Sequence, residues 1–341
     1  MRNSSRSRLF PAPRCPSAKR SLTPGLLVGL LFALFVSPPL YADEAMDWVQ
    51  KMSDAMRNLN YQGNFVYMHN NTLEGMQISH YRDQHGEKER LVSLNGEARE
   101  VIRDNQNLTC IWPSSRKVIV DVSRKNSFSP IFIPEDIARL EKFYNMKMVG
   151  KDRVADAMTV IVHIDPRDQY RYGMKFWINE QNGLMMKSSL LDENQQVIEE
   201  VMFTRLEVFE GDSGPKINTM PPIGDNFTLV RYHSGDTSEV FAADGAWQLD
   251  GVPEGFWRES VLRRKIPDSE LFVQQMVYTD GLASLSVFIE KKSESAQGGM
   301  SSMGAVNAYM RILDDHSVTA IGEVPEVTVK RVAESVIYQA Q

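Results

Sequence analysis

Eight consecutive residues, 165–172 (DPRDQYRY), hold two Asp, two Arg and two Tyr. Carboxylates, guanidinium groups and phenols gathered in this way could take part in acid–base catalysis. The runs on either side alternate apolar and polar residues, as strands do, and Pro166 cannot donate to a strand ladder. We therefore predict a charged hairpin turn with solvated or cross-strand-paired side chains, where a single change to Ala costs about 1 kcal/mol or less.

No other motif in the chain indicates catalysis or metal binding. The histidines form no H-x-x-x-H pair and do not combine with Cys at the spacing of a zinc site. They are His69, His80, His85, His163, His233 and His316. There is no G-x-S-x-G elbow, and GGMSSMG at 298–304 resembles one only weakly. We predict no catalytic residue, no metal ligand and no cofactor, and interpret His69, His80 and His163 as ordinary strand residues.

The elements around the charged turn form a predominantly β chain. Residues 44–59 place Ala45, Trp48, Val49, Met52, Met56 and Leu59 at helical spacing. From residue 61 the period changes to two, and short runs joined by Gly, Asn and Asp turns predict an antiparallel meander. Residues 134–136 (PED) suit the first turn of a helix that interrupts it. The fold class is α+β.

A break in composition divides the chain. Residues 211–226 are rich in Gly, Pro, Asp and Asn and are predicted to be a linker between a first domain, 43–210, and a smaller second domain, 227–341. In the second domain we predict strands near 227–232, 256–264, 272–278 and 282–290. A Ser/Gly/Met-rich loop at 293–304, a strand and a helix from Pro325 follow. That helix should place Val329, Val332, Ala333 and Val336 on one face.

The first 42 residues have the composition of a signal peptide. A basic leader precedes the apolar run 26–36, which is shorter than the ~20 residues needed to span a bilayer, and cleavage is expected after Ala42. An uncleaved anchor is the alternative. The leader holds six of the 38 basic residues and none of the 44 acidic ones, so its removal lowers the net charge from −6 to −12. Such an acidic chain is a poor candidate for nucleic-acid binding.

Two further features concern apolar residues. Cys110 lies in an apolar run (LTCIW) and is interpreted as a buried strand residue rather than a reactive thiol. The segment NSFSPIFIP has few polar neighbours and could form an apolar loop that grips a hydrophobic ligand. Its candidate lipid-binding residues are Phe128, Ile131, Phe132 and Ile133. The alternative is a loop folded back over its own core.

Several stretches in both domains carry a family resemblance. In the first domain they are YQGNFVYMHNNTLEGMQISHYRD, RLVSLNGEAREVIRD and VGKDRVADAMTVIVHIDPRDQYRYGMKFWINEQNGLMMKSSLLD. In the second they are WQLDGVPEGFW, YTDGLASLSVFIEKK and IGEVPEVTVKRVAESV. Together they resemble the RseB/MucB family of periplasmic regulators of the sigma-E envelope-stress factor. The resemblance covers nearly all of the chain after the leader, in order.

The resemblance implies a first domain similar to the lipoprotein carrier LolA, an antiparallel half-barrel, flexibly linked to the smaller domain. It also implies a soluble periplasmic protein whose smaller domain binds the periplasmic part of an RseA/MucA-type anti-sigma factor. Binding would shield that factor from the site-1 protease, and lipid or lipopolysaccharide fragments would release it. A simple lipid or lipoprotein carrier is the alternative function, although a carrier of this type would end near Phe209. A homo-oligomer is left open.

Overall fold

The computed structural model describes residues 41–105, 107–122, 137–211, 213–219, 226–232, 247–265 and 272–338. The leader and the four candidate lipid-binding residues Phe128, Ile131, Phe132 and Ile133 lie outside these ranges. Among the described residues, strands outnumber helices, and the α+β class expected from the sequence is confirmed.

The first described element is α1 (Tyr41–Asn58), which confirms the helix predicted at 44–59. Ala45, Val49, Met52 and Ala55 recur three or four residues apart and are buried. This spacing places them on one face of a helix, so a single apolar stripe faces the sheet. The helix is held by packing of this stripe rather than by intrinsic propensity, as is usual for amphipathic helices.

The first sheet has twelve strands in the order β12-β6-β5-β4-β3-β2-β1-β11-β10-β9-β8-β7. The strands are β1 (Asn60–His69), β2 (Thr72–Asp83), β3 (Gly86–Ser93), β4 (Glu100–Asp104), β5 (Asn107–Trp112), β6 (Lys117–Val122), β7 (Tyr144–Val154), β8 (Ala157–Pro166), β9 (Gly173–Asn179), β10 (Met185–Leu191), β11 (Val197–Phe209) and β12 (Thr228–Tyr232). Neighbours pair antiparallel except β12 and β6, which are parallel. The predicted meander is therefore present.

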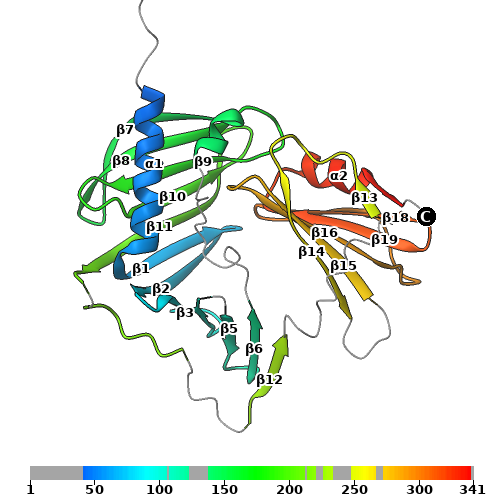
Figure 1. Cartoon of the computed structure of the whole chain (residues 1–341), viewed down its shortest axis with the longest axis horizontal. Helices are drawn as coiled ribbons and strands as arrows, with labels where there is room; N and C mark the ends of the chain where they lie inside the picture. The colour runs from blue at the N-terminus through cyan, green and yellow to red at the C-terminus, as the bar shows by residue number, and fades with distance from the viewer. Residues whose placement is uncertain are drawn as a thin grey trace, which may run out of the picture. The chain divides into compact units, whose positions relative to one another are not determined.

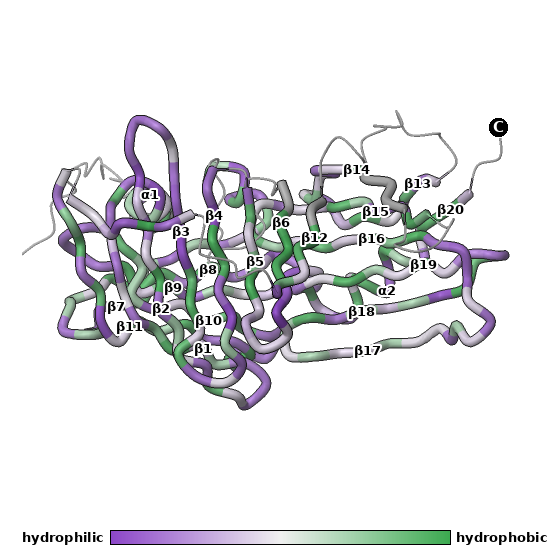
Figure 2. Tube along the Cα trace, turned by 90° about the horizontal axis from the view of Figure 1, so that it is seen from below, coloured by the Kyte–Doolittle hydropathy of each residue, from purple (hydrophilic) through white to green (hydrophobic). Residues whose placement is uncertain are grey.

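The sheet curves around α1 as an open half-barrel (Figure 1). The large side chains of its core come from α1 and from the strand faces turned toward it, among them Tyr61, Phe65, Phe176 and Phe203. Hydrophobic residues gather along the strands, while many of the connecting turns are hydrophilic (Figure 2). Alternation along each strand thus gives one buried face.

Short turns close the hairpins of the first sheet. Asn70 and Asn71, with φ of 47° and 60°, join β1 to β2, and Ala155 and Asp156, with φ of 46° and 65°, join β7 to β8. Two consecutive residues at positive φ give the turn whose twist matches a two-residue hairpin. Asn and Asp adopt that conformation readily, whereas Ala does so at a cost.

A 3-10 helix, η1 (Ile137–Lys142), precedes β7, where the sequence predicted a helix from residue 134. Ile137 and Leu140 on η1 are buried in the core beneath α1. Cys110 is buried in β5, as predicted. His69, His80 and His163 lie in β1, β2 and β8, so their interpretation as strand residues is also confirmed.

The strand predicted near 227–232 exists as β12, but it pairs with β6 of the first sheet. It therefore does not belong to the second sheet, although the sequence placed it at the start of the second domain. A small apolar cluster lies beside this pairing, where Ile217 and Phe227 pack against Ile102, Ile111 and Val118. Part of the predicted linker 211–226 is thus anchored to the first sheet.

The second sheet has six antiparallel strands in the order β14-β15-β16-β19-β18-β17. They are β14 (Trp257–Lys265), β15 (Phe272–Thr279), β16 (Ser284–Lys291), β17 (Gly299–Met303), β18 (Val306–Leu313) and β19 (His316–Gly322). A two-stranded sheet of β13 (Trp247–Leu249) and β20 (Val336–Tyr338) accompanies it. Helix α2 (Glu326–Glu334) buries Val329, Val332 and Ala333 in a core of its own.

Two expectations for this region are corrected. The predicted loop 293–304 contains β17, whose five residues are all exposed, because this edge strand has no apolar alternation to announce it. Val336 is buried, but it lies in β20 rather than on the predicted helix, since α2 ends at Glu334.

Candidate functional site

Residues 165–172, which we name the docking turn, connect β8 to β9 as predicted. The Asp168 side chain accepts a hydrogen bond from the backbone N–H of Tyr170 at 2.9 Å, a local bond typical of Asp in turns. Asp165 remains on the first sheet, where it pairs with Lys147 and His163 at 3.0 Å. Arg167 is exposed. These residues behave as a charged turn should.

Arg171 does not behave as a residue of a charged, solvated turn, because its side chain is fully buried. Its Nε donates to Asp280 Oδ2 at 2.5 Å, and the other two nitrogens donate to Asp168 and to the backbone carbonyl of Glu254. Asp280 and Glu254 both belong to the second sheet domain. The prediction of a solvated or cross-strand-paired turn is therefore wrong for Arg171, whose main partner is far away in the sequence.

Aromatic rings complete the surroundings of the guanidinium. The Arg171 Cζ lies 4.8 Å from the ring centroid of Phe143 and 4.8 Å from that of Phe256. Phe143 follows η1 and Phe256 precedes β14, so each domain contributes one ring. The face of an aromatic ring attracts a cation, and this attraction strengthens where water is excluded.

Asp280 is held in place by its own turn between β15 and β16. Its Oδ1 accepts the backbone N–H groups of Leu282 at 2.9 Å and Ala283 at 2.7 Å. Its Oδ2 accepts both Arg171 and the Tyr144 hydroxyl, the latter at 2.8 Å. Burial, reinforced by the charge of Asp280, raises the pKa of Tyr144 well above its ordinary value. The phenol therefore stays protonated and donates.

The two tyrosines of the docking turn also contact the second domain. The Tyr170 carbonyl accepts a bond from the Thr328 hydroxyl at 2.9 Å, and its phenol oxygen lies 2.8 Å from Arg331 Nη1. Tyr172 accepts a bond from Asn307 Nδ2 at 2.9 Å. Thr328 and Arg331 are on α2, and Asn307 is on β18. Three consecutive residues of one turn thus bind a sheet, a helix and a loop.

A second buried group of charges lies on β2, β3 and β4. His80 places Nδ1 2.8 Å from the Leu59 carbonyl and Nε2 3.1 Å from Glu87 Oε1. Arg103 bonds both Glu87, at 2.6 Å, and Glu89, at 3.0 Å. Burial opposes ionisation of Glu87, but the bond from His80 and the charge of Arg103 outweigh it and lower its pKa to about 2.

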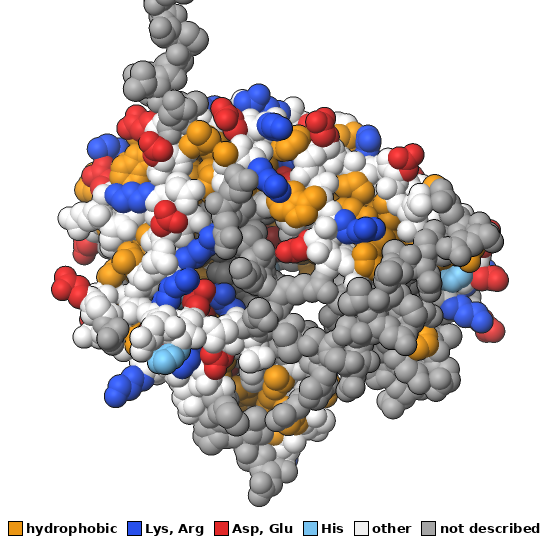
Figure 3. Space-filling model, in the orientation of Figure 1, with side chains coloured by type: hydrophobic (Ala, Val, Ile, Leu, Met, Phe, Trp, Pro, Cys, Tyr) orange, Lys and Arg blue, Asp and Glu red, His pale blue; other side chains and the backbone are white. Residues whose placement is uncertain are grey.

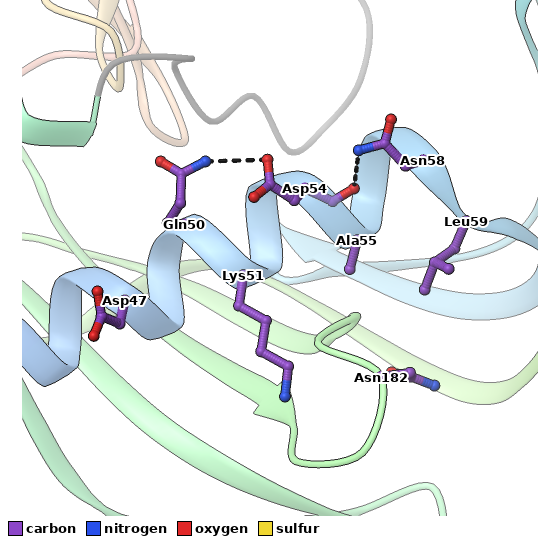
Figure 4. Close-up of a pocket in the computed structure, with 8 residues that line it drawn as sticks. All are labelled: Asp47, Gln50, Lys51, Asp54, Ala55, Asn58, Leu59 and Asn182. Atoms are coloured by element: carbon purple, nitrogen blue, oxygen red, sulfur yellow. Dashed lines mark hydrogen bonds between the residues drawn. The ribbon is translucent and has the colours of Figure 1, made fainter.

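A shallow groove runs along the exposed side of α1 (Figure 4). Its volume is about 530 Å³, and Asp47, Gln50, Lys51, Asp54, Ala55, Asn58, Leu59 and Asn182 line it. Lys51 Nζ donates to the Glu180 carbonyl at 2.9 Å, so the helix is tied to the turn beyond β9. The groove is open to solvent, and six of its eight lining residues are polar or charged, whereas small-molecule sites are mostly enclosed by apolar residues. We assign no ligand to it.

The remaining observations bear on other kinds of site. Within the described ranges, no group of three or more His, Cys, Asp or Glu could hold a metal ion. None of the helices in those ranges is both long and apolar enough to cross a membrane. On the face shown in Figure 3, basic and acidic side chains are interspersed.

Sequence patterns singled out residues 165–172 but not Asp280, Glu254 or Phe256. One local signal was available, since Asp280 and Gly281 form a turn between two predicted strands. Nothing local connects that turn with Arg171.

Two mainly antiparallel sheets, each packed against an α-helix and joined through the docking turn, define a two-domain α+β protein. Sequence profiles extend this description: the MucB/RseB N-terminal domain matches residues 44–223, and the MucB/RseB C-terminal domain matches residues 242–337. This chain therefore belongs to the MucB/RseB family.

Individual relatives agree with this assignment. The sigma factor AlgU regulatory protein MucB of Pseudomonas aeruginosa is 31% identical over 91% of this chain and 96% of its own length. The sigma-E factor regulatory protein RseB of Escherichia coli K12 is 25% identical over 86% of this chain and 90% of its own. The structure of the Pseudomonas aeruginosa MucA/MucB complex matches with a TM-score of 0.68 and 29% identity, over 87% of this chain and 100% of that one.

Proposed function

We propose that this protein is a periplasmic regulator of a sigma-E-type stress response that binds the periplasmic domain of an RseA/MucA-type anti-sigma factor. One observation carries the proposal. The chain resembles MucB crystallised with the periplasmic part of MucA, at a TM-score of 0.66 over 87% of this chain and 100% of that one. The relatives named above are regulatory proteins, which supports a binding role rather than catalysis.

In this proposal the second domain supplies the surface that binds the anti-sigma factor. Binding shields the factor from the site-1 protease, because proteases cut segments that are exposed and locally unfolded. Lipid or lipopolysaccharide fragments release it. A ligand can do so only if it binds the free protein better than the complex, and a coupling of ~1–3 kcal/mol would change affinity about 5- to 150-fold.

The first test measures binding of the host's purified anti-sigma periplasmic domain by calorimetry. The same mixture is then exposed to the site-1 protease. We expect a complex and slower cleavage within it. Absence of a complex would remove the regulator function and leave the lipid or lipoprotein carrier as the alternative. A complex cleaved as fast as the free factor would remove the shielding.

The second test concerns release. Lipopolysaccharide fragments are titrated into the labelled complex, and the dissociation constant is followed. The variant F128S/F132S should resist release, because it removes two apolar side chains from the predicted lipid-binding segment. Leu94→Ser is the matched control, since Leu94 is an exposed apolar residue of the first domain. If no amphiphile changes the constant, the protein is a shield that lipid does not regulate.

A further inference from the structure

The contact made by the docking turn is polar and local. An ion pair and hydrogen bonds join Tyr170, Arg171 and Tyr172 to the second domain. Two cation–ring contacts add to them, Arg171 on Phe256 and Arg331 on Tyr170. Each sheet keeps an apolar core of its own. Among the described residues that pack against the first core, Leu282 alone comes from the second domain. Interfaces of this kind between domains resemble transient rather than obligate ones.

The Arg171–Asp280 pair has a property that a pair inside one core lacks. Within a core, burying two charges is costly and the mutual attraction only roughly offsets it. Here separation of the two domains would return both charges to water, so no unpaired charge would remain buried. The docked and separated arrangements can therefore lie close in free energy.

The same contact is satisfied in only one relative orientation of the two domains. The three nitrogens of the Arg171 side chain donate to three different acceptors, and two of these belong to the second domain. A planar guanidinium satisfies such a set in one orientation only. A small shift of one domain would break these bonds together.

We propose that the docking turn is an interdomain latch with two states. In the docked state Arg171 pairs with Asp280 between Phe143 and Phe256. In the separated state both charges are hydrated while each domain stays folded. Such a two-state element is what a partner or ligand must bias if its binding is to change the arrangement of the domains.

Two variants open the latch by independent means. Asp280→Asn keeps a carbonyl oxygen for the N–H groups of Leu282 and Ala283. It removes the fully buried counter-charge, so that in the docked state Arg171 pairs only with the partly exposed Asp168 of its own domain. Gly255→Ala acts sterically. Its Cβ would lie 2.6 Å from a ring carbon of Phe143 and 2.7 Å from Arg171 Nη2, both in the first domain.

Each variant has a control. Asp192→Asn makes the same change in a turn where the Asp side chain likewise accepts two backbone N–H groups. Gly96→Ala adds a Cβ at a positive φ of 71°, as Gly255→Ala does at 92°, but meets no atom within 4 Å. The controls separate the effect on docking from lost turn bonds and from backbone strain.

The measurement is a distance distribution between spin labels by double electron–electron resonance. The labels are attached to D47C and E294C, both exposed and in different domains, in the full chain carrying C15A and C110A. Circular dichroism checks that each variant folds. Because the protein is free, the result does not depend on the proposed partner.

We expect one narrow distribution for the parent and both controls. Asp280→Asn and Gly255→Ala should each shift the ratio of separated to docked molecules by about tenfold or more, as expected for the loss of a buried counter-charge or a direct clash. If both variants retain the parent distribution, the latch is overturned. A broad distribution in the parent itself would also overturn it, since the turn would then not hold the domains.

Discussion

Arg171 and Asp280 are 109 residues apart in the chain, and they form an ion pair in which both side chains are fully buried. The pair turns a hairpin connection of one sheet into a binding element for the other. Arg167, four residues before Arg171, is exposed, and its side chain makes a long hydrogen bond, 3.4 Å, to the Tyr144 carbonyl. Of the two arginines in this turn, Arg171 therefore holds the second domain, whereas Arg167 does not.

That difference predicts unequal stability effects. Arg171→Ala leaves Asp280 buried without its partner and should lower the free energy of unfolding by about 3–5 kcal/mol where the domains remain docked. Separation of the domains would reduce this cost. Arg167→Ala should stay within about 0.5 kcal/mol, as exposed sites usually do. Urea unfolding of both variants measures the contrast, and equal midpoints would contradict it.

Glu87 predicts a loss of stability in acid. Its pKa is about 2 in the folded protein, below the ordinary value of 4.5, so its ionised form stabilises the fold above pH 4.5. As the pH falls from there toward 2, up to about 3 kcal/mol is lost. Glu87→Gln should flatten this part of the stability curve. Glu141→Gln, an exposed control on η1, should leave the slope unchanged.

The predicted linker 211–226 should be the most protease-sensitive segment, and the contacts of its first part narrow the expected cut. Asn60 bonds the Gly211 carbonyl at 2.9 Å, and Ile217 packs in the small cluster beside β4–β6. We expect the first cut after Ile217. N-terminal sequencing of the fragments locates it. A first cut within 61–120 would contradict the division into two domains.

Export predicts a defined start of the mature chain. The basic leader and short apolar run should be removed after Ala42, so that the secreted protein begins at Asp43. Sequencing of protein recovered from the periplasm of the native host tests this. Recovery in the membrane with Met1 retained would favour the uncleaved anchor.

The spacing of apolar residues predicted most of the helices and strands, because that spacing depends on which face of each element is buried. The apolar stripe of α1 and the alternation of apolar and polar residues in β1, β2 and β8 each indicate which face of the element is buried. The exposed edge strand β17 was missed because no buried face marks it. The role of Arg171 was missed for a different reason: periodicity says nothing about which distant carboxylate will neutralise a charge.

The pairing of β12 with β6 has a consequence for any attempt to isolate the first domain. A fragment that stops at residue 210 would lack residues 228–232 and would present the backbone N–H and C=O groups of β6 to solvent. It would also lose Ile217 and Phe227 from the small cluster. Open edges of this kind recruit strands from other molecules. A truncation boundary beyond Tyr232 is therefore needed to keep such a fragment monomeric.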